Sequence, residues 1–261
     1  MLIVLTNDDG IEAKGLRTLH RRLARDHEVV VVAPAVEASA CSHGLSLHRP
    51  LRIRKHARDA YSVDGTPVDC VTLAVFQILR KRRPDLIISG INQGQNLGTD
   101  VLYSGTVAGA IEGAILGIPS MAVSLVSFTS SEFEPAAEFA ALLAGMLRKK
   151  RLPEDTCLNV NVPTQVTGAP FPVRLTRLGR RRYTKVIKER MDPRGKKYYW
   201  IGGDPVELDL SDDVDSAAIR EGCISVTPLK LDLTAHEHFK TVGARLKLPR
   251  SRRGGKPAHI G

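Results

Sequence analysis

The chain has 261 residues, of which 43% are hydrophobic, and its formal net charge is +10. This length suits one large α/β domain with an appendage better than two full domains. No apolar run reaches the ~18 residues that a membrane span needs, and residues 1–5 lack the features of a secretory signal. The four cysteines show neither zinc-type spacing nor the density of a disulfide scaffold. We therefore expect a cytoplasmic protein without a membrane partner.

Apolar and amphipathic segments alternate from the start of the chain. Apolar runs predict strands at residues 2–5, 28–33, 84–90, 118–125 and 158–162. Helical spacing predicts helices at residues 15–25, 66–78, 105–116 and 134–149. Residues 51–63 favour a further strand or hairpin. The β-α-β order at the start predicts a parallel sheet with right-handed crossovers. We therefore expect an α/β fold, a Rossmann-like and mostly parallel sheet flanked by helices.

The pattern changes at about residue 173, where strands become shorter and charge denser. Asp192-Pro-Arg-Gly195 predicts the turn of a projecting β-hairpin, whose return strand carries Tyr198, Tyr199 and Trp200. Because isolated hairpins are marginally stable in water, this one should pack on a second subunit. We expect a catalytic core at 1–172, a hairpin and C-terminal oligomerisation region at 173–243, and a tail at 244–261.

The tail carries six Lys and Arg residues and no acidic residue, so the rest of the chain has a net charge of +10 − 6 = +4. Interleaved Pro and Gly predict disorder, and such a tail could contact nucleic acid weakly. A second basic cluster, with Tyr183 within it, runs from Arg177 to Lys188. The simpler explanation is a solvated segment for the tail and a solvated or interface surface for the cluster, neither with a nucleic-acid partner.

Three polar loops follow predicted strands, at residues 7–10, 34–42 and 90–98. In an open α/β sheet, ligands bind outside the carboxyl ends of the strands. We therefore expect a binding site where these three loops converge.

The first loop contains the acidic pair Asp8-Asp9. Two carboxylates facing one cavity repel each other and raise one pKa, and a bound cation relieves this repulsion. Oxygen ligands suit Mg²⁺ or Mn²⁺, whereas structural zinc would need clustered His and Cys. A turn with a helix N-cap ahead of Gly10 explains the local sequence equally well.

The third loop places Asn92 and Asn96 among glycines, so amide side chains and bare backbone could both approach a ligand. An ordinary glycine-rich turn has the same composition. The segment 104–106, Ser-Gly-Thr, then opens a helix whose first N–H groups and dipole favour an anion. Ser and Thr also commonly cap helices without binding any ligand, so the local sequence leaves phosphate binding open.

Taken together, these loops resemble the SurE family of survival-protein nucleotidases. The matching segments are LTNDDGI at 5–11, VVAPAVEASACS at 31–42, DGTPVDCV at 64–71, PDLIISGINQGQNLGTDVLYSGTVAGAIEG at 84–113, LNVNVP at 158–163, YYWIGG at 198–203 and DVDSAAIREGCISVTPL at 213–229. They cover all of the chain except its tail, and the joint pattern is highly specific.

This resemblance implies a Rossmann-like core, one divalent metal ion, and hydrolysis of nucleoside 5′- and 3′-monophosphates, with short polyphosphate sometimes also cleaved. It implies homodimers or homotetramers that exchange C-terminal segments. Carried over by position, the metal ligands are Asp8, Asp9, Ser39 and Asn92. The phosphate-facing residues are Asn96, Ser104, Gly105 and Thr106. Asp8 is our candidate for positioning the attacking water.

Three other functions share parts of the pattern. An aspartate-nucleophile phosphatase also carries an Asp after its first strand, but Gly10 stands where that class needs its second Asp. A non-enzymatic, receiver-like phosphoacceptor domain also binds magnesium through an acidic pair, but here the third strand ends in Ser89-Gly90 without an acceptor Asp. The basic segments would suit a nucleic-acid-binding protein, for which tight, salt-sensitive RNA binding without phosphatase activity would be diagnostic.

Overall fold

The computed structural model describes residues 1–150, 152–164, 171–184 and 187–246. Met1–Leu231 form one compact unit, and the chain from Asp232 onward forms a second. None of the helices within these ranges is long and apolar enough to cross a bilayer. Most of the basic tail, from residue 247 on, lies outside the described residues, so its contact with nucleic acid stays a prediction.

The elements of the first unit up to residue 126 are β1 (Leu2–Thr6), α1 (Lys14–Leu23), β2 (Glu28–Pro34), β3 (Ile53–Ala57), β4 (Ala60–Val63), α2 (Pro67–Leu73), the π-helix η1 (Ala74–Ile78), β5 (Leu86–Gln93), the 3-10 helix η2 (Gly98–Leu102), α3 (Gly105–Ile115) and β6 (Ser120–Val126). Those that follow are α4 (Glu134–Lys149), β7 (Thr156–Pro163), β8 (Val173–Leu175), β9 (Arg181–Thr184), β10 (Ile187–Met191), β11 (Lys197–Ile201), β12 (Asp204–Glu207), α5 (Asp215–Arg220) and β13 (Ile224–Lys230). The second unit contains η3 (His236–His238) and α6 (Phe239–Leu246).

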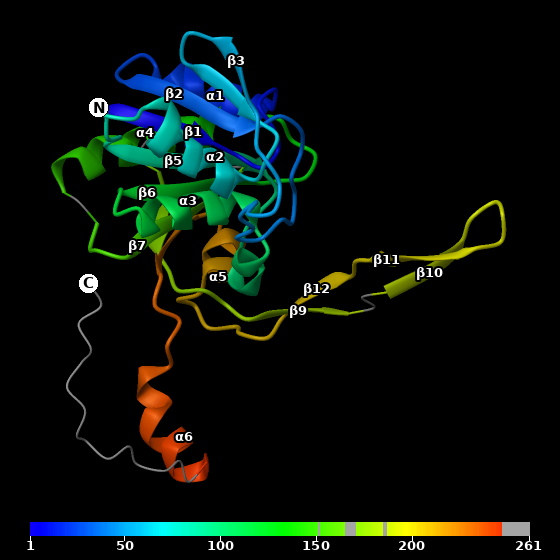
Figure 1. Cartoon of the computed structure of the whole chain (residues 1–261). Helices are drawn as coiled ribbons and strands as arrows, with labels where there is room; N and C mark the ends of the chain where they lie inside the picture. Colours follow the sequence, from blue (N-terminus) through cyan, green and yellow to red (C-terminus); the bar gives the residue numbers. More distant parts are fainter. Residues whose placement is uncertain (151, 165–170, 185–186, 247–261) are drawn as a thin grey trace, which may run out of the picture. The chain divides into compact units, whose positions relative to one another are not determined.

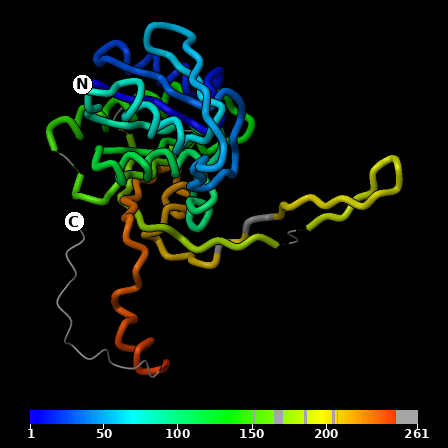
Figure 2. The backbone as a smooth tube through the Cα atoms, in the orientation of Figure 1, coloured from blue at the N-terminus to red at the C-terminus, as the bar shows by residue number. Residues whose placement is uncertain are grey.

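Nine of the described strands form one sheet, in the order β3-β4-β2-β1-β5-β6-β7-β13-β8. The run from β4 to β7 is parallel throughout, whereas β3 and β13 pair antiparallel with β4 and β7. Helices cover both faces of this sheet, as Figures 1 and 2 show. The Rossmann-like, mostly parallel α/β fold predicted from the sequence is confirmed.

Burial on both faces explains why the central strands are almost uninterrupted apolar runs. One core cluster joins one face of the sheet to α1 and α4, through residues such as Leu19 and Phe139. On the opposite face, α2 packs through Cys70 and Val71, and α3 packs through Val107 and Ala110. The sheet is thereby fixed from both sides, and loops at its edge start from rigid strand ends.

The hairpin predicted around residues 192–195 is formed by β10 and β11. Asp192 Oδ1 accepts hydrogen bonds from the backbone N–H groups of Arg194 and Lys196, at 2.9 and 2.8 Å, and Gly195 takes φ +75°. Every residue of β10 and β11 is exposed. The two strands extend away from the sheet (Figure 1).

Two helix predictions need correction. The predicted helix 66–78 is α-helical only to Leu73, and continues as the π-helix η1. In α4, the apolar side chains Phe139, Leu142, Leu143 and Met146 recur at helical spacing, which predicts one buried face, but Leu142 and Met146 are 45% and 53% exposed. The fully buried face that packs on α1 and the sheet consists of Phe139 and alanines, with Leu143 and Leu147 partly buried against it, because small side chains allow the close approach of two packed layers.

Candidate functional site

The order of the strands creates a switch point between β1 and β5, because the chain builds outward from β1 in one direction and then starts again at β5 on its other side. Ligands of open α/β sheets bind at such a point, beyond the carboxyl ends of the strands. A cavity of about 890 Å³ lies here. It is lined by Asp8, Asp9, Glu37, Ser39, Ala40, Asn92, Gln93, Gly94, Gln95, Asn96, Asp100, Tyr103, Ser104, Phe128, Tyr183, Ile201 and Gly202.

The three loops predicted to converge therefore do so. All four predicted metal ligands line this one cavity, although they come from the ends of three strands. Asn96 and Ser104 line it as well. Gly105 and Thr106 are not among the lining residues and are buried behind it.

The loop after β1 forms a tight turn at Gly10, which takes φ +98°. Asn7 closes this turn, since its Nδ2 donates to the carbonyl oxygen of Gly10 at 2.9 Å. Helix α1 begins at Lys14 with Ala13 as its N-cap and has no side-chain capping bond. The capping alternative for Asp8-Asp9 therefore does not hold, and both carboxylates face the cavity.

Asp8 is nearly inaccessible, with 4% of its surface exposed. The backbone N–H of Thr106 donates to Asp8 Oδ2 at 3.0 Å, and the Thr106 hydroxyl donates to Asp8 Oδ1. Burial raises the pKa of Asp8, and the Thr106 hydrogen bonds oppose that rise. Helix α3 comes this close because residue 105 is glycine: a Cβ there would lie 2.8 Å from Cys41 Sγ and 2.9 Å from Asp8 Oδ2.

Asp9 is half-buried beside Asp8. Burial, followed by repulsion from the Asp8 carboxylate, raises the pKa of Asp9 to about 6, while a backbone hydrogen bond from Gln93 works in the opposite direction. The Asp8 carboxylate thus disfavours the ionised form of Asp9, as expected for neighbouring like charges.

Asn92 lies near the end of β5, where the pairing with β6 shifts register between Gly90 and Asn92. Such an irregularity re-aims the side chains that follow it. Asn92 Nδ2 donates to the carbonyl oxygen of Gly94 at 2.7 Å, so its amide nitrogen is occupied and its oxygen is available to a cation.

Ser39 lies in the long loop after β2 and is exposed to the cavity. The backbone N–H of Ala38 donates to the carbonyl oxygen of Asp8 at 2.7 Å, which ties this loop to the acidic pair. Ser42 ties it to the segment before α3, because its hydroxyl donates to the carbonyl oxygen of Leu102 at 2.7 Å. Ser39 Oγ itself donates to Glu37 Oε1 at 2.7 Å, which leaves the lone pairs of the hydroxyl oxygen free.

A network of buried amides holds Asn96 in place. The side chains of Asn159 and Asn161, two residues apart and so on one face of β7, both donate to the carbonyl oxygen of Asn96, at 2.8 and 3.0 Å. Asn161 Oδ1 accepts from the backbone N–H of Asn96, and Asn96 Nδ2 donates to Ser124 Oγ. Because these groups are buried and, apart from the unpaired Asn159 Oδ1, hydrogen-bonded to one another, the network fixes the position of the loop.

The start of α3 combines capping with support of the acidic pair. Ser104 is the N-cap, and its hydroxyl accepts from the backbone N–H of Val107 at 3.1 Å. Thr106 gives both of its donors to Asp8. Of the predicted phosphate-facing residues, Asn96 and Ser104 therefore line the cavity, while Thr106 acts on it through Asp8.

Several lining residues were missed in the sequence, among them Glu37, Tyr103 and Phe128. Phe128 follows the apolar run that forms β6. Its position just past the carboxyl end of a strand could have marked it as a candidate binding residue. Tyr183 was noted only as part of a basic cluster. Its hydroxyl donates to Asp100 Oδ2 at 2.7 Å, and Arg181 pairs with the same oxygen at 3.0 Å.

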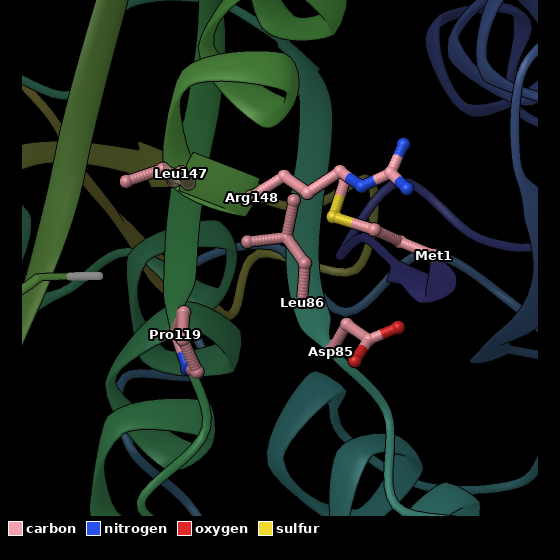
Figure 3. A pocket seen from close by; sticks show the side chains of 6 residues that line it. All are labelled: Met1, Asp85, Leu86, Pro119, Leu147 and Arg148. Carbon is pink, nitrogen blue, oxygen red and sulfur yellow. The ribbon is translucent and has the colours of Figure 1, made fainter. Parts of the chain in front are cut away.

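A smaller cavity, of about 310 Å³, is lined by Met1, Asp85, Leu86, Pro119, Leu147 and Arg148 (Figure 3). Met1 and Asp85 immediately precede β1 and β5, so it lies at the amino ends of the strands. Asp85 Oδ2 accepts from the backbone N–H of Leu2 at 2.8 Å and serves the fold. The larger cavity, at the carboxyl ends, is therefore the candidate site.

The larger cavity fits a hard divalent cation. Its candidate ligands are two carboxylates, a hydroxyl and an amide oxygen, which is the donor set that Mg²⁺ and Mn²⁺ accept. A positive charge between Asp8 and Asp9 would also offset the repulsion from Asp8 that, after burial, raises the pKa of Asp9. Among the residues described, no cluster of three or more His, Cys, Asp or Glu offers a different site.

Comparisons with known proteins point to one family. The family model described as survival protein SurE matches residues 3–185. The 5′-nucleotidase SurE of Moorella thermoacetica is 49% identical over 251 residues, covering 94% of this chain and 96% of the relative. The 5′-nucleotidase SurE of Syntrophotalea carbinolica is also 49% identical, covering 92% and 95%.

The fold agrees with this relationship. The crystal structure of the SurE protein from Aquifex aeolicus superposes with a TM-score of 0.83 at 40% sequence identity, covering 94% of this chain and all of the other. The family predicted from the loop motifs is therefore confirmed, and the chain belongs to the SurE family.

Proposed function

We propose that this chain is a divalent-cation-dependent phosphomonoesterase that hydrolyses nucleoside 5′-monophosphates, with 3′-monophosphates and short polyphosphate as further substrates. The relatives from Moorella thermoacetica and Syntrophotalea carbinolica are 5′-nucleotidases, which supports the reaction class. The observation that carries the metal dependence is the pair Asp8-Asp9, two carboxylates with raised pKa values in one cavity with oxygen donors.

In this proposal Asp8, Asp9, Ser39 and Asn92 hold the cation. When bound, the ion would polarise a phosphoryl oxygen and lower the pKa of a water molecule. Asn96 and Ser104 face the phosphate at the start of α3, where the positive end of the helix dipole stabilises negative charge. Asp8 orients the attacking water, and Thr106 keeps the Asp8 carboxylate in position.

A substrate panel tests this function. We expect AMP, GMP, CMP and UMP to release phosphate with Mg²⁺ or Mn²⁺ present, EDTA to abolish the activity, and excess metal to restore it. Phosphate release is measured colorimetrically, with ribose 5-phosphate and a short polyphosphate in the same panel. Full activity in EDTA would refute the metal dependence, and a trapped phospho-aspartate would indicate the aspartate-nucleophile mechanism instead.

Metal affinity should depend on pH because Asp9 must lose its proton to bind a cation. With a pKa of about 6 in the metal-free protein, Asp9 is mostly protonated at pH 5 and mostly ionised at pH 7. We expect Mn²⁺ to bind about tenfold more weakly at pH 5 than at pH 7, as measured by calorimetry. Asp9→Asn should remove most of this difference; an unchanged pH dependence in that variant would contradict the assignment.

The raised pKa of Asp9 also affects the stability of the metal-free fold. Metal affinity rises with pH, whereas this stability should fall. A raised pKa means that the folded protein binds the Asp9 proton more tightly than the unfolded chain, whose Asp keeps a pKa near 3.8. The tighter binding of this proton adds to the free energy of unfolding. The added stability is complete below pH 3.8 and is lost as the pH rises through about 6. Bound cation should offset the loss at neutral pH, because it stabilises only the folded state.

We further propose a homodimer or homotetramer formed through the C-terminal region. The support is the exposed apolar surface of the hairpin, where Trp200 is 63% and Ile201 is 84% exposed. Large exposed apolar side chains gathered on two strands mark an interaction surface. Light scattering on the purified chain measures this oligomeric state.

We also propose a cytoplasmic location, which is supported by the four free thiols.

A further inference from the structure

We propose that Phe128 forms the stacking surface for the nucleobase, and so makes the site selective for nucleoside monophosphates over other phosphate esters. The inference rests on the proposed nucleotidase function and extends it to a residue outside the metal and phosphate groups. Its starting observation is that Phe128 lines the same cavity as Asp8 and Asp9, yet 74% of its surface is exposed.

The size of the cavity points to a substrate much larger than phosphate. At about 890 Å³ it lies in the range of pockets that enclose whole small-molecule ligands. In the proposed function, the acidic and amide groups of the cavity bind the cation and the phosphate, which leaves the rest of the lining for another part of the substrate. The remaining lining includes the rings of Tyr103, Phe128 and Tyr183, and apolar or aromatic walls beside a few polar groups are typical of ligand pockets.

Although exposed, Phe128 is held by specific contacts. Its ring lies over Gly94, where a Cβ would come within 2.6 Å of Phe128 Cε1. Gln93 Nε2 donates to the carbonyl oxygens of Phe128 and Ser130, at 3.2 and 3.3 Å. Ser127 Oγ accepts from the backbone N–H of Ser130 at 2.8 Å and closes the turn that carries the ring.

These contacts link the Phe128 ring to the segment that carries the proposed cation ligand Asn92. Gln93 and Gly94 directly follow Asn92, and Asn92 itself bonds the carbonyl oxygen of Gly94. A base stacked on Phe128 would therefore have a defined position relative to the cation ligand. An apolar ring that is 74% exposed contributes little to the fold, whereas a ring carried on an ordered turn loses little conformational entropy when a base covers it.

Tyr183 is a weaker candidate for the same role. Tyr183 belongs to β9, and its hydroxyl donates to Asp100 of η2 at 2.7 Å, so the polar end of this ring is already engaged. Phe128 has no polar atom to satisfy, so stacking is the contact that its side chain can offer. Because every base has a π-face, such a surface recognises nucleosides without selecting one base.

The test compares AMP with ribose 5-phosphate, which has the same phosphate ester and sugar but no base. For Phe128→Ala we expect KM for AMP to rise about 5- to 100-fold, with kcat largely kept, because a stacking contact binds ground state and transition state alike. The ratio of kcat/KM for AMP to that for ribose 5-phosphate should fall by the same factor. Phe128→Trp and Phe128→Tyr should restore it.

The matched control is Phe76→Ala, since Phe76 is 64% exposed on η1 and does not line the cavity. This variant should keep the wild-type ratio. An equal loss of kcat/KM for both substrates in Phe128→Ala, or no loss for either, would overturn the proposal. Failure of the wild-type protein to cleave AMP would instead refute the proposed function. Calorimetric binding of AMP in EDTA then still tests the stacking, because Phe128→Ala should weaken it by the same factor.

Discussion

Asp8→Asn should lower kcat for AMP by roughly 10³-fold at saturating Mn²⁺, which corresponds to about 4 kcal/mol of lost transition-state stabilisation. The substitution keeps the size of the side chain, and an amide oxygen can still accept the backbone N–H of Thr106. It removes the negative charge that a cation needs and the group that we propose to orient water. The effect should therefore appear in turnover and in metal binding together.

Folding should not suffer from this substitution. Burial raises the pKa of Asp8, which means that ionised Asp8 is unfavourable in the metal-free protein. The melting temperature of Asp8→Asn in EDTA should thus equal or exceed that of the wild type, whereas the increase on adding Mn²⁺ should be lost. Asp59→Asn, in the exposed turn between β3 and β4, is the control and should behave as wild type. Near wild-type turnover by Asp8→Asn would remove Asp8 from the metal site.

Thr106→Val should weaken metal affinity about 10- to 100-fold, the usual effect of removing a group that orients a metal ligand. Thr106 is completely buried, and valine preserves its shape while deleting the hydroxyl that donates to Asp8 Oδ1. Without this hydrogen bond the pKa of Asp8 should rise further, because the Thr106 hydroxyl is the largest influence that lowers it. The backbone N–H of Thr106 remains as a donor, so the loss should be smaller than for Asp8→Asn.

A titration of phosphatase activity with Mn²⁺ distinguishes this positioning role from damage to the fold. Thr106→Val should need more Mn²⁺ for half-maximal activity but regain much of its turnover at high Mn²⁺. Thr106→Ser restores the hydroxyl and should restore the wild-type titration. If Thr106→Val and the wild type give the same Mn²⁺ dependence, the hydroxyl does not support the metal site.

The order of strands and helices was predictable because burial on both faces of the sheet requires regular apolar patterns along the sequence. Strands such as β1 and β2 are continuous apolar runs, and helices such as α1 repeat leucine at helical spacing. Boundaries and packed faces were less predictable. Leu142 and Met146 look like core residues in sequence, yet the buried residues of α4 are Phe139 and alanines, because the distance between helix and sheet selects mostly small side chains.

The convergence of the polar loops was predictable because parallel strands bring their carboxyl ends together at one edge of the sheet. The proposed ligands Asp8, Asp9, Ser39 and Asn92 came from the family resemblance, since the local sequence left the role of Asp8-Asp9 open. The partners of these residues were not recognisable. Thr106 lies 98 positions from Asp8, and Asn161 lies 65 positions from Asn96. A threonine at the start of a helix or an asparagine in a strand looks locally like a cap or a polar face.

The amino-acid sequence alone thus established the α/β class, the family resemblance and the acidic pair, since these depend on local periodicity and on short motifs. Only the tertiary structure showed that α1 is capped without Asp8 or Asp9, that Thr106 serves Asp8, and that Phe128 faces the same cavity. Each of these facts depends on which distant segments the sheet and helices bring within hydrogen-bonding or van der Waals distance. That juxtaposition is set by packing of the whole core, to which no single motif corresponds.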